Sequence, residues 1–329
     1  NLASSYSYLG DYNNALELQN TVYNAFKGLL GKNHPNTIHV LSSLANSYFV
    51  LGDYGKACEL QNIVYNARKE ILGENHPDTI HALGNLACAY SYLGDYSKAL
   101  ELQNTVYNTG KKILGKNHPD TLSALHNLAT FYFDLGDHSK ALELHNIVYK
   151  AFKEILGENH PETLGALGNL ANSYSDLGDY NKALEMRNAV YNTRKEILGE
   201  NHPDTLHALG NLASSYSDLG DCNKALEMRN AVYNTRKEIL GENHPDTLSA
   251  LNNLASSYSN LGEYNKVLEL MNTVYNKRKE IQGESHPDTL LVLSNLLAVQ
   301  IYQVKTDNQS IKKHMTAYFE NINNLKTTA

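Results

Sequence analysis

Histidines that precede proline are the residues whose regular spacing first suggests chemistry in this sequence. They recur every 42 residues, as His34, His76, His118, His160, His202, His244 and His286. The ligands of a zinc ion all lie about 2 Å from it, whereas equivalent residues of stacked repeats are roughly 8–10 Å apart. We therefore expect no shared metal site, and we interpret each histidine as the residue that begins a helix.

Asparagine recurs with the same period and is the second candidate for a functional role. These ladder asparagines are Asn1, Asn85, Asn127, Asn169, Asn211, Asn253 and Asn295, and Ser43 replaces asparagine in one repeat. An amide both donates and accepts hydrogen bonds, so a ladder of amides can hold the backbone of an extended peptide. Alternatively, the amides bond to neighbouring helices and hold the repeats in register. Both interpretations stay open at this point.

Other polar residues surround the ladder in the sequence and would determine specificity if it binds peptides. They are His39, His81, His126, His207, Asn46, Asn172 and Asn252 and, one helical turn further on, Asp134, Asp176 and Asp218. Lysine and arginine are missing from these positions, so we expect a neutral to mildly acidic surface that favours uncharged or basic peptides. Four arginines late in the second helices would reverse this expectation if they reach the same surface. They are Arg68, Arg194, Arg236 and Arg278.

Other kinds of chemistry find little support. The sequence contains no phosphate-binding glycine loop, HExxH pair or nucleophile motif, and its serines and histidines repeat instead of forming one unique cluster. The net charge of −7 disfavours a nucleic-acid surface, and no apolar stretch is long enough to span a bilayer. We expect a non-enzymatic protein without cofactors, small-molecule substrates, nucleic acid or membrane contacts. Its expected partners are proteins or peptides in an extended conformation.

The three cysteines stand at three different positions of the repeat. They are Cys58, Cys88 and Cys222. This scatter is not typical of a disulfide framework or of a metal-binding set of thiols. A reducing, cytoplasmic setting fits best.

The 42-residue period indicates one supersecondary unit copied along the chain. In residues 202–243, Pro203 suits the first position of a helix, and apolar residues then recur at steps of three and four up to Leu219. Gly220 ends this run, and a second helical run continues to Gly241. Each repeat is therefore predicted to be two antiparallel helices of roughly 16–19 residues. The predicted fold class is all-α.

Small and aromatic residues predict how the helices pack. Ala213 in the first helix and Ala225 in the second recur in other repeats, and small side chains let the two helix axes approach closely. Most of the 23 tyrosines occupy three repeat positions, and we interpret them as packing residues whose hydroxyl groups meet water or backbone.

The pattern NLAxxYxxLGDYxKALEL resembles the tetratricopeptide repeat. The His-Pro-Asp-Thr opening, the 42-residue length and the RKEILGENHPDT connector narrow the resemblance to the kinesin light chain subclass. This resemblance implies a right-handed superhelical solenoid of antiparallel helix pairs, in which the first helices line a concave groove that binds peptides. It also implies that the ladder asparagines contact the bound peptide.

One position departs from the family. Where members often carry a large aromatic residue in the second helix, this chain has Gln19, Gln61, Gln103, His145, Arg187, Arg229 and Met271. Packing at this position must differ, so the family's superhelical pitch does not carry over.

The predicted organisation is one continuous array. Residues 1–33 form a partial first repeat, residues 34–285 form six complete repeats, and residues 286–329 form a divergent C-terminal repeat with a capping helix. The predicted apolar face of this helix is Ile311, Met315, Tyr318, Ile322 and Leu325.

Two functions fit this organisation. The first is a kinesin light chain-like adaptor that binds peptide segments of other proteins in its groove. The alternative is the sensor or oligomerisation arm of a larger signalling ATPase of the NB-ARC or STAND type. The partner, the pathway and the oligomeric state are open at this stage.

Overall fold

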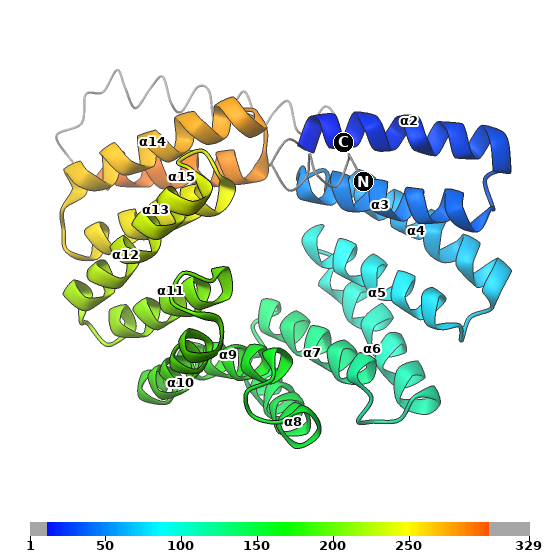
Figure 1. Ribbon diagram of the computed structural model, residues 1–329, viewed down its shortest axis with the longest axis horizontal. Helices are drawn as coiled ribbons and strands as arrows, with labels where there is room; N and C mark the ends of the chain where they lie inside the picture. Colours follow the sequence, from blue (N-terminus) through cyan, green and yellow to red (C-terminus); the bar gives the residue numbers. More distant parts are fainter. Residues whose placement is uncertain (1–11, 303–329) are drawn as a thin grey trace. The chain divides into compact units, whose positions relative to one another are not determined.

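The computed structural model describes residues 12–302, and every regular element in that range is a helix (Figure 1). The first helices of the repeats are α3 (Pro35–Val50), α5 (Pro77–Tyr92), α7 (Pro119–Asp134), α9 (Pro161–Asp176), α11 (Pro203–Asp218), α13 (Pro245–Asn260) and α15 (Pro287–Tyr302). The second helices are α2 (Tyr12–Leu30), α4 (Tyr54–Leu72), α6 (Tyr96–Ile113), α8 (His138–Leu156), α10 (Tyr180–Leu198), α12 (Cys222–Leu240) and α14 (Tyr264–Gln282). The predicted all-α array of helix pairs is confirmed.

The chain divides into two compact units, residues 1–190 and residues 191–329, and the division falls within α10. In each unit every helix packs against the next along the chain, from α2 to α9 in the first and from α11 to α15 in the second. The start of the predicted partial repeat and the predicted capping helix lie outside the described residues. None of the described helices is both long and apolar enough to cross a membrane.

The His-Pro pairs begin the first helices, as the sequence predicts. Proline occupies the first turn, where its missing N–H removes no helical hydrogen bond. The histidine is the N-cap, and Nδ1 of His76 accepts a hydrogen bond from the backbone N–H of Asp78 at 3.2 Å. The same bond recurs in every first helix from α3 to α15, and in α3 the backbone N–H of Asn36 is the donor. These histidines therefore have a structural role.

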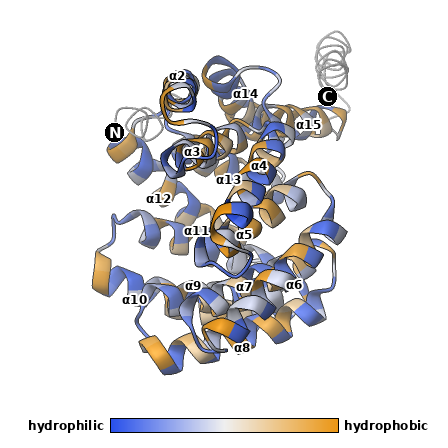
Figure 2. Cartoon of the chain, turned by 90° about the vertical axis from the view of Figure 1, so that its right-hand side faces the viewer, coloured by the Kyte–Doolittle hydropathy of each residue, from blue (hydrophilic) through white to orange (hydrophobic). Residues whose placement is uncertain are grey.

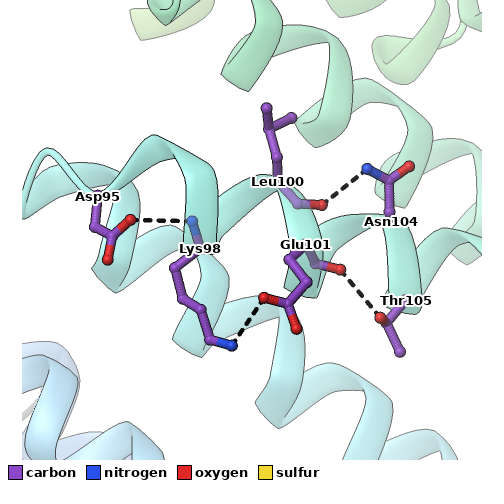
Figure 3. A network of polar contacts seen from close by, with 6 residues as sticks. All are labelled: Asp95, Lys98, Leu100, Glu101, Asn104 and Thr105. Carbon is purple, nitrogen blue, oxygen red and sulfur yellow. Dashed lines mark hydrogen bonds and ion pairs between the residues drawn. The ribbon is translucent and has the colours of Figure 1, made fainter.

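The second helices from α4 to α12 begin at an aspartate that follows the Leu-Gly turn, whereas Glu263 takes this place before α14 and its side chain makes no cap hydrogen bond. Asp95 Oδ1 accepts a hydrogen bond from the backbone N–H of Lys98 at 3.0 Å, which satisfies an N–H that has no partner within the helix (Figure 3). Lys98 Nζ lies 2.9 Å from Glu101 on the solvent side of α6. Gly94, just before the cap, has φ 82°, which a residue with a side chain rarely adopts. The turn residues thus determine where one helix ends and the next begins.

Alanines of the two helices of a repeat lie together in a buried cluster. Ala87 of α5 and Ala99 of α6 are both fully buried and form one cluster with Phe131 of α7. Each helix carries apolar and polar segments (Figure 2), and the apolar ones face the neighbouring helices. Tyrosines such as Tyr107 and Tyr149 are half-buried against these clusters, in agreement with the packing role predicted for them.

Polar residues fill the interior at the middle of the second helix. Gln61 donates to Asn46 Oδ1, and the Gln103 side chain donates to the carbonyl oxygen of Ala124 at 2.9 Å. His145 Nδ1 lies 2.8 Å from Ser173 Oγ, and its ring stacks at 5.3 Å from the ring of His126. Burial, and to a smaller extent the neighbouring His126, lowers the pKa of His145 to about 4. His145 is therefore neutral at physiological pH.

The alanine contact can be tested by overpacking it. We expect Ala87→Leu to destabilise the protein by about 1–3 kcal/mol, because the added methyl groups have no space between α5 and α6. Ala231→Leu on the exposed face of α12 is the matched control and should change stability by less than about 0.5 kcal/mol. Thermal and denaturant unfolding measure the stability of both variants. Equal stabilities of the two variants would contradict close packing at this alanine.

Burial of His145 makes stability depend on pH. Between pH 6.5 and about 4 the unfolded chain binds a proton at this residue and the folded chain does not, so stability falls as the pH drops through this window. We expect His145→Gln, which places there the residue found at Gln103, to remove up to about 3 kcal/mol of this loss. Denaturant midpoints of the wild type and of His145→Gln, measured between pH 6.5 and about 4, show whether the variant loses less stability. Parallel pH profiles of the two proteins would show that His145 does not contribute.

Candidate peptide-binding surface

The described ladder asparagines lie on the first helices, each beside a buried apolar pair that follows it, Leu-Ala in α5 to α13 and Leu296-Leu297 in α15. Two of them, Asn253 and Asn295, are exposed. The other four are half-buried, namely Asn85, Asn127, Asn169 and Asn211. Asn169 Nδ2 lies 3.3 Å from His126 Nε2 of the preceding repeat. Asn85, Asn127, Asn211 and Asn253 make no side-chain hydrogen bond to another described residue. A ladder asparagine therefore forms a hydrogen bond to the neighbouring repeat at Asn169, and this bond does not recur at those four positions.

A cavity of about 460 Å³ lies between α5, α6 and α7 in the N-terminal unit. Two successive ladder asparagines, Asn85 and Asn127, line it together with the predicted site residue His81. Apolar side chains such as Ile80 and Val106 form much of the remaining wall. No lysine or arginine lines this cavity, in agreement with the neutral to mildly acidic surface expected from the first helices.

An equivalent but smaller pocket of about 150 Å³ lies between α11, α12 and α13 in the C-terminal unit. It is lined by the ladder pair Asn211 and Asn253 and by His207, at the same repeat positions as in the first cavity. Arg229 and Arg236 of the second helix also line it. The expectation of a neutral surface is therefore wrong for this repeat, because arginines of the second helix reach the space between the first helices.

Arg229 is held in this pocket by uncharged groups. Its Nη1 donates to Ser257 Oγ at 2.9 Å and its Nη2 to Ser214 Oγ at 3.3 Å. Burial lowers the pKa of the guanidinium, although it stays charged, and Asp218 partly offsets this shift. Burial, with Arg194 and Arg236, also lowers the pKa of His207. The pocket therefore presents positive charge together with uncharged donors.

The remaining predicted site residues lie elsewhere. Asn172 accepts a hydrogen bond from Arg187 Nη2 at 2.9 Å, which ties α9 to α10 inside the N-terminal unit. Asp134, Asp176 and Asp218 are exposed at the last residue of their helices and line neither pocket. Asn295 lines neither pocket.

Sequence reasoning missed the contribution of the second helix to these pockets. Gln103 and Gly110 line the first pocket and Arg229 the second, all from second helices. The signal was present, since residue type varies at both repeat positions between otherwise similar copies. No group of three or more possible metal ligands occurs among residues 12–302. All three cysteines are free, and Cys58 is buried.

Comparison with protein families identifies the repeat. The tetratricopeptide repeat profile matches residues 1–49, 38–112, 98–154, 120–196, 162–238 and 219–280. This family is a repeat scaffold and not a catalytic class. No curated protein gives a significant match to the sequence.

One solved structure supports the narrower resemblance, and others share the fold alone. A Podospora anserina protein described as a kinesin light chain with nearly identical TPR-like repeats is 28% identical, with a TM-score of 0.53 over 63% of this chain and 98% of that one. NprR in complex with its cognate peptide NprX has a TM-score of 0.58 at 15% identity, over 96% and 90% of the two chains. A Pyrococcus horikoshii STAND protein with a tetratricopeptide repeat sensor has a TM-score of 0.54 at 16% identity, over 96% of this chain and 47% of that one.

The profile matches residues along more than half of the chain, and the helix pairs repeat as the profile requires. The chain belongs to the tetratricopeptide repeat family.

Proposed function

We propose that this protein is a non-catalytic scaffold that binds extended peptide segments of other proteins along its first helices. One observation carries the proposal. In each unit a pocket is lined by two successive ladder asparagines that have no hydrogen-bond partner among the described residues. Asn85, Asn127 and Asn211 are half-buried and Asn253 is exposed. Half-buried amides without partners lose hydrogen bonds to bulk water, so a ligand that supplies peptide groups gains binding free energy at the first three.

The spacing of the ladder suits an extended peptide. Equivalent positions of neighbouring repeats are roughly 8–10 Å apart, and an extended chain advances about 3.3 Å per residue. About every third peptide group would therefore meet an asparagine. Recognition of this kind depends on the peptide backbone, and the pockets between the asparagines then select side chains.

The two pockets would select different side chains. Arg229 and Arg236 favour an acidic group in the C-terminal unit, whereas Asp78 and Asp120 line the cavity of the N-terminal unit. A protein partner fits this surface better than a nucleic acid, because the net charge of the chain is −7. The free cysteines fit a cytoplasmic adaptor of the kinesin light chain type.

A second function has specific support. The P. horikoshii STAND protein carries this fold as its sensor. The same array would then be the sensor or oligomerisation arm of a signalling ATPase. Coiled-coil heptads in the same polypeptide would favour the adaptor, and a phosphate-binding loop after a strand would favour the ATPase.

The ladder can be tested with the asparagines of one cavity. Peptides selected from a random phage-displayed library on the wild-type protein serve as the probe. We expect the double variant Asn85→Ala, Asn127→Ala to bind them about tenfold more weakly, because each amide loses its bonds to the peptide backbone. Fluorescence polarisation with labelled peptides measures the change.

Asn24→Ala with Asn108→Ala is the matched control, since both asparagines are exposed on second helices at equivalent repeat positions. The control should bind as the wild type does. If the ladder variant folds normally and also keeps its affinity, the ladder is structural and the proposed surface is wrong.

A further inference from the structure

The cavity between α5, α6 and α7 contains one repeat position that differs from its counterparts. Near the end of the second helix, where Gly110 stands, the other described repeats have a large side chain. These residues are Phe26, Arg68, Phe152, Arg194, Arg236 and Arg278. The pocket that contains Arg236 measures about 150 Å³, and the one at Gly110 about 460 Å³. The absent side chain accounts for much of the additional space.

The arginines at this position share one kind of partner, the residue that follows the proline of the next repeat. Three of them donate from Nη1 to its carbonyl oxygen at 3.0–3.1 Å. The pairs are Arg68 with Asp78, Arg194 with Asp204, and Arg236 with Asp246. In the fourth, Arg278 Nη1 lies 2.8 Å from the carboxylate of Asp288. Each arginine thus ties one repeat to the next.

Beside Gly110 the acceptors remain and the arginine is missing. Asp120 is the counterpart of those aspartates and lines the cavity, as does Asp78. Within ion-pair distance, Asp120 has one partner among the described residues, the ring of His118 at 3.8 Å, which is charged only when protonated. Gln103 also lines the cavity, and its buried Oε1 accepts no hydrogen bond in the described part of the chain.

The walls suit the aliphatic part of an arginine side chain. Ile80, Val106 and Ala124 supply apolar surface for the methylene groups. Asp120 lines the same cavity, and its counterparts in other repeats accept hydrogen bonds from the arginines. Phe152 shows that an aromatic ring fits the same position in the next repeat, where it is 3% exposed. Asp78 and Asp120 line the cavity and no lysine or arginine does, so a cationic occupant is favoured over an aromatic one.

We propose that this cavity binds an arginine side chain of a partner peptide, which takes the place that Arg68 and its counterparts fill in other repeats. The inference rests on the proposed function, because Asn85 and Asn127 line the same cavity and would hold the backbone on either side of the arginine. The partner is therefore a peptide that carries an arginine at one fixed position.

The direct test uses a probe that does not depend on peptide binding. N-acetyl-arginine N-methylamide is titrated into the full chain, and methyl NMR signals of Ile80 and Val106 are followed. We expect saturable shifts with this probe and none with the citrulline analogue, which has the same shape without charge. Binding of the phenylalanine analogue in its place, or no binding of the arginine probe, overturns the proposal.

Gly110→Arg fills the cavity from within and should abolish saturation by the probe. A Cβ at this residue would lie 3.2 Å from Thr121 Oγ1, a contact that the other repeats accommodate, so the melting temperature is measured as well. Gly28→Arg adds the same charge where nothing lies within 4 Å and should bind as the wild type does. Asp120→Asn, which keeps the fold, should weaken binding roughly two- to fivefold. Unchanged probe binding by Gly110→Arg also overturns the proposal.

Peptide selection separates this inference from the proposed function. Peptides selected on the wild type should share an arginine, and selection on Gly110→Arg should lose that preference while peptides are still recovered. If peptides are recovered without an arginine preference, the proposed function stands and this inference fails. If the probe binds but no peptide is recovered, the cavity is confirmed and the proposed function fails.

Discussion

Close packing of the two helices of each repeat at a pair of alanines is the constraint on which the rest of the structure depends. With Ala87 and Ala99 fully buried, the helices approach so closely that larger side chains must lie to either side of the contact. The His-Pro cap and the Leu-Gly-Asp turn start each helix at the same residue of every repeat. As a result, equivalent residues meet equivalent surroundings within each compact unit. A substitution at one repeat position then changes one pocket and leaves the backbone as it is.

This constraint explains why the second helix matters for a surface formed by first helices. Its middle position points between consecutive first helices, where Gln103 bonds to the Ala124 carbonyl and Arg229 bonds to two serines. Holding a half-buried guanidinium by serine hydroxyls is a costly choice for stability alone. Variation at the second-helix positions alters the charge and volume of the pockets, from Arg236 in one repeat to Gly110 in another.

Much of this could be predicted from the sequence, because the period repeats each signal many times. The helix boundaries follow from proline, glycine and the apolar spacing, and the caps follow from His76 and Asp95. The ladder asparagines could be placed on the first helices for the same reason. The charge of the pockets could not be predicted, since it depends on how far Arg229 and Arg236 extend from a helix that is distant in sequence. The cavity at Gly110 was also missed, because the absence of a side chain gives no signal until the neighbouring helices are in place.

A crystal structure of the chain with a peptide selected on it tests the central claim most directly. The account predicts an extended peptide along the first helices, with its backbone about 3 Å from the amides of Asn85 and Asn127. A peptide bound on the second helices, or one that leaves these amides in water, would contradict it.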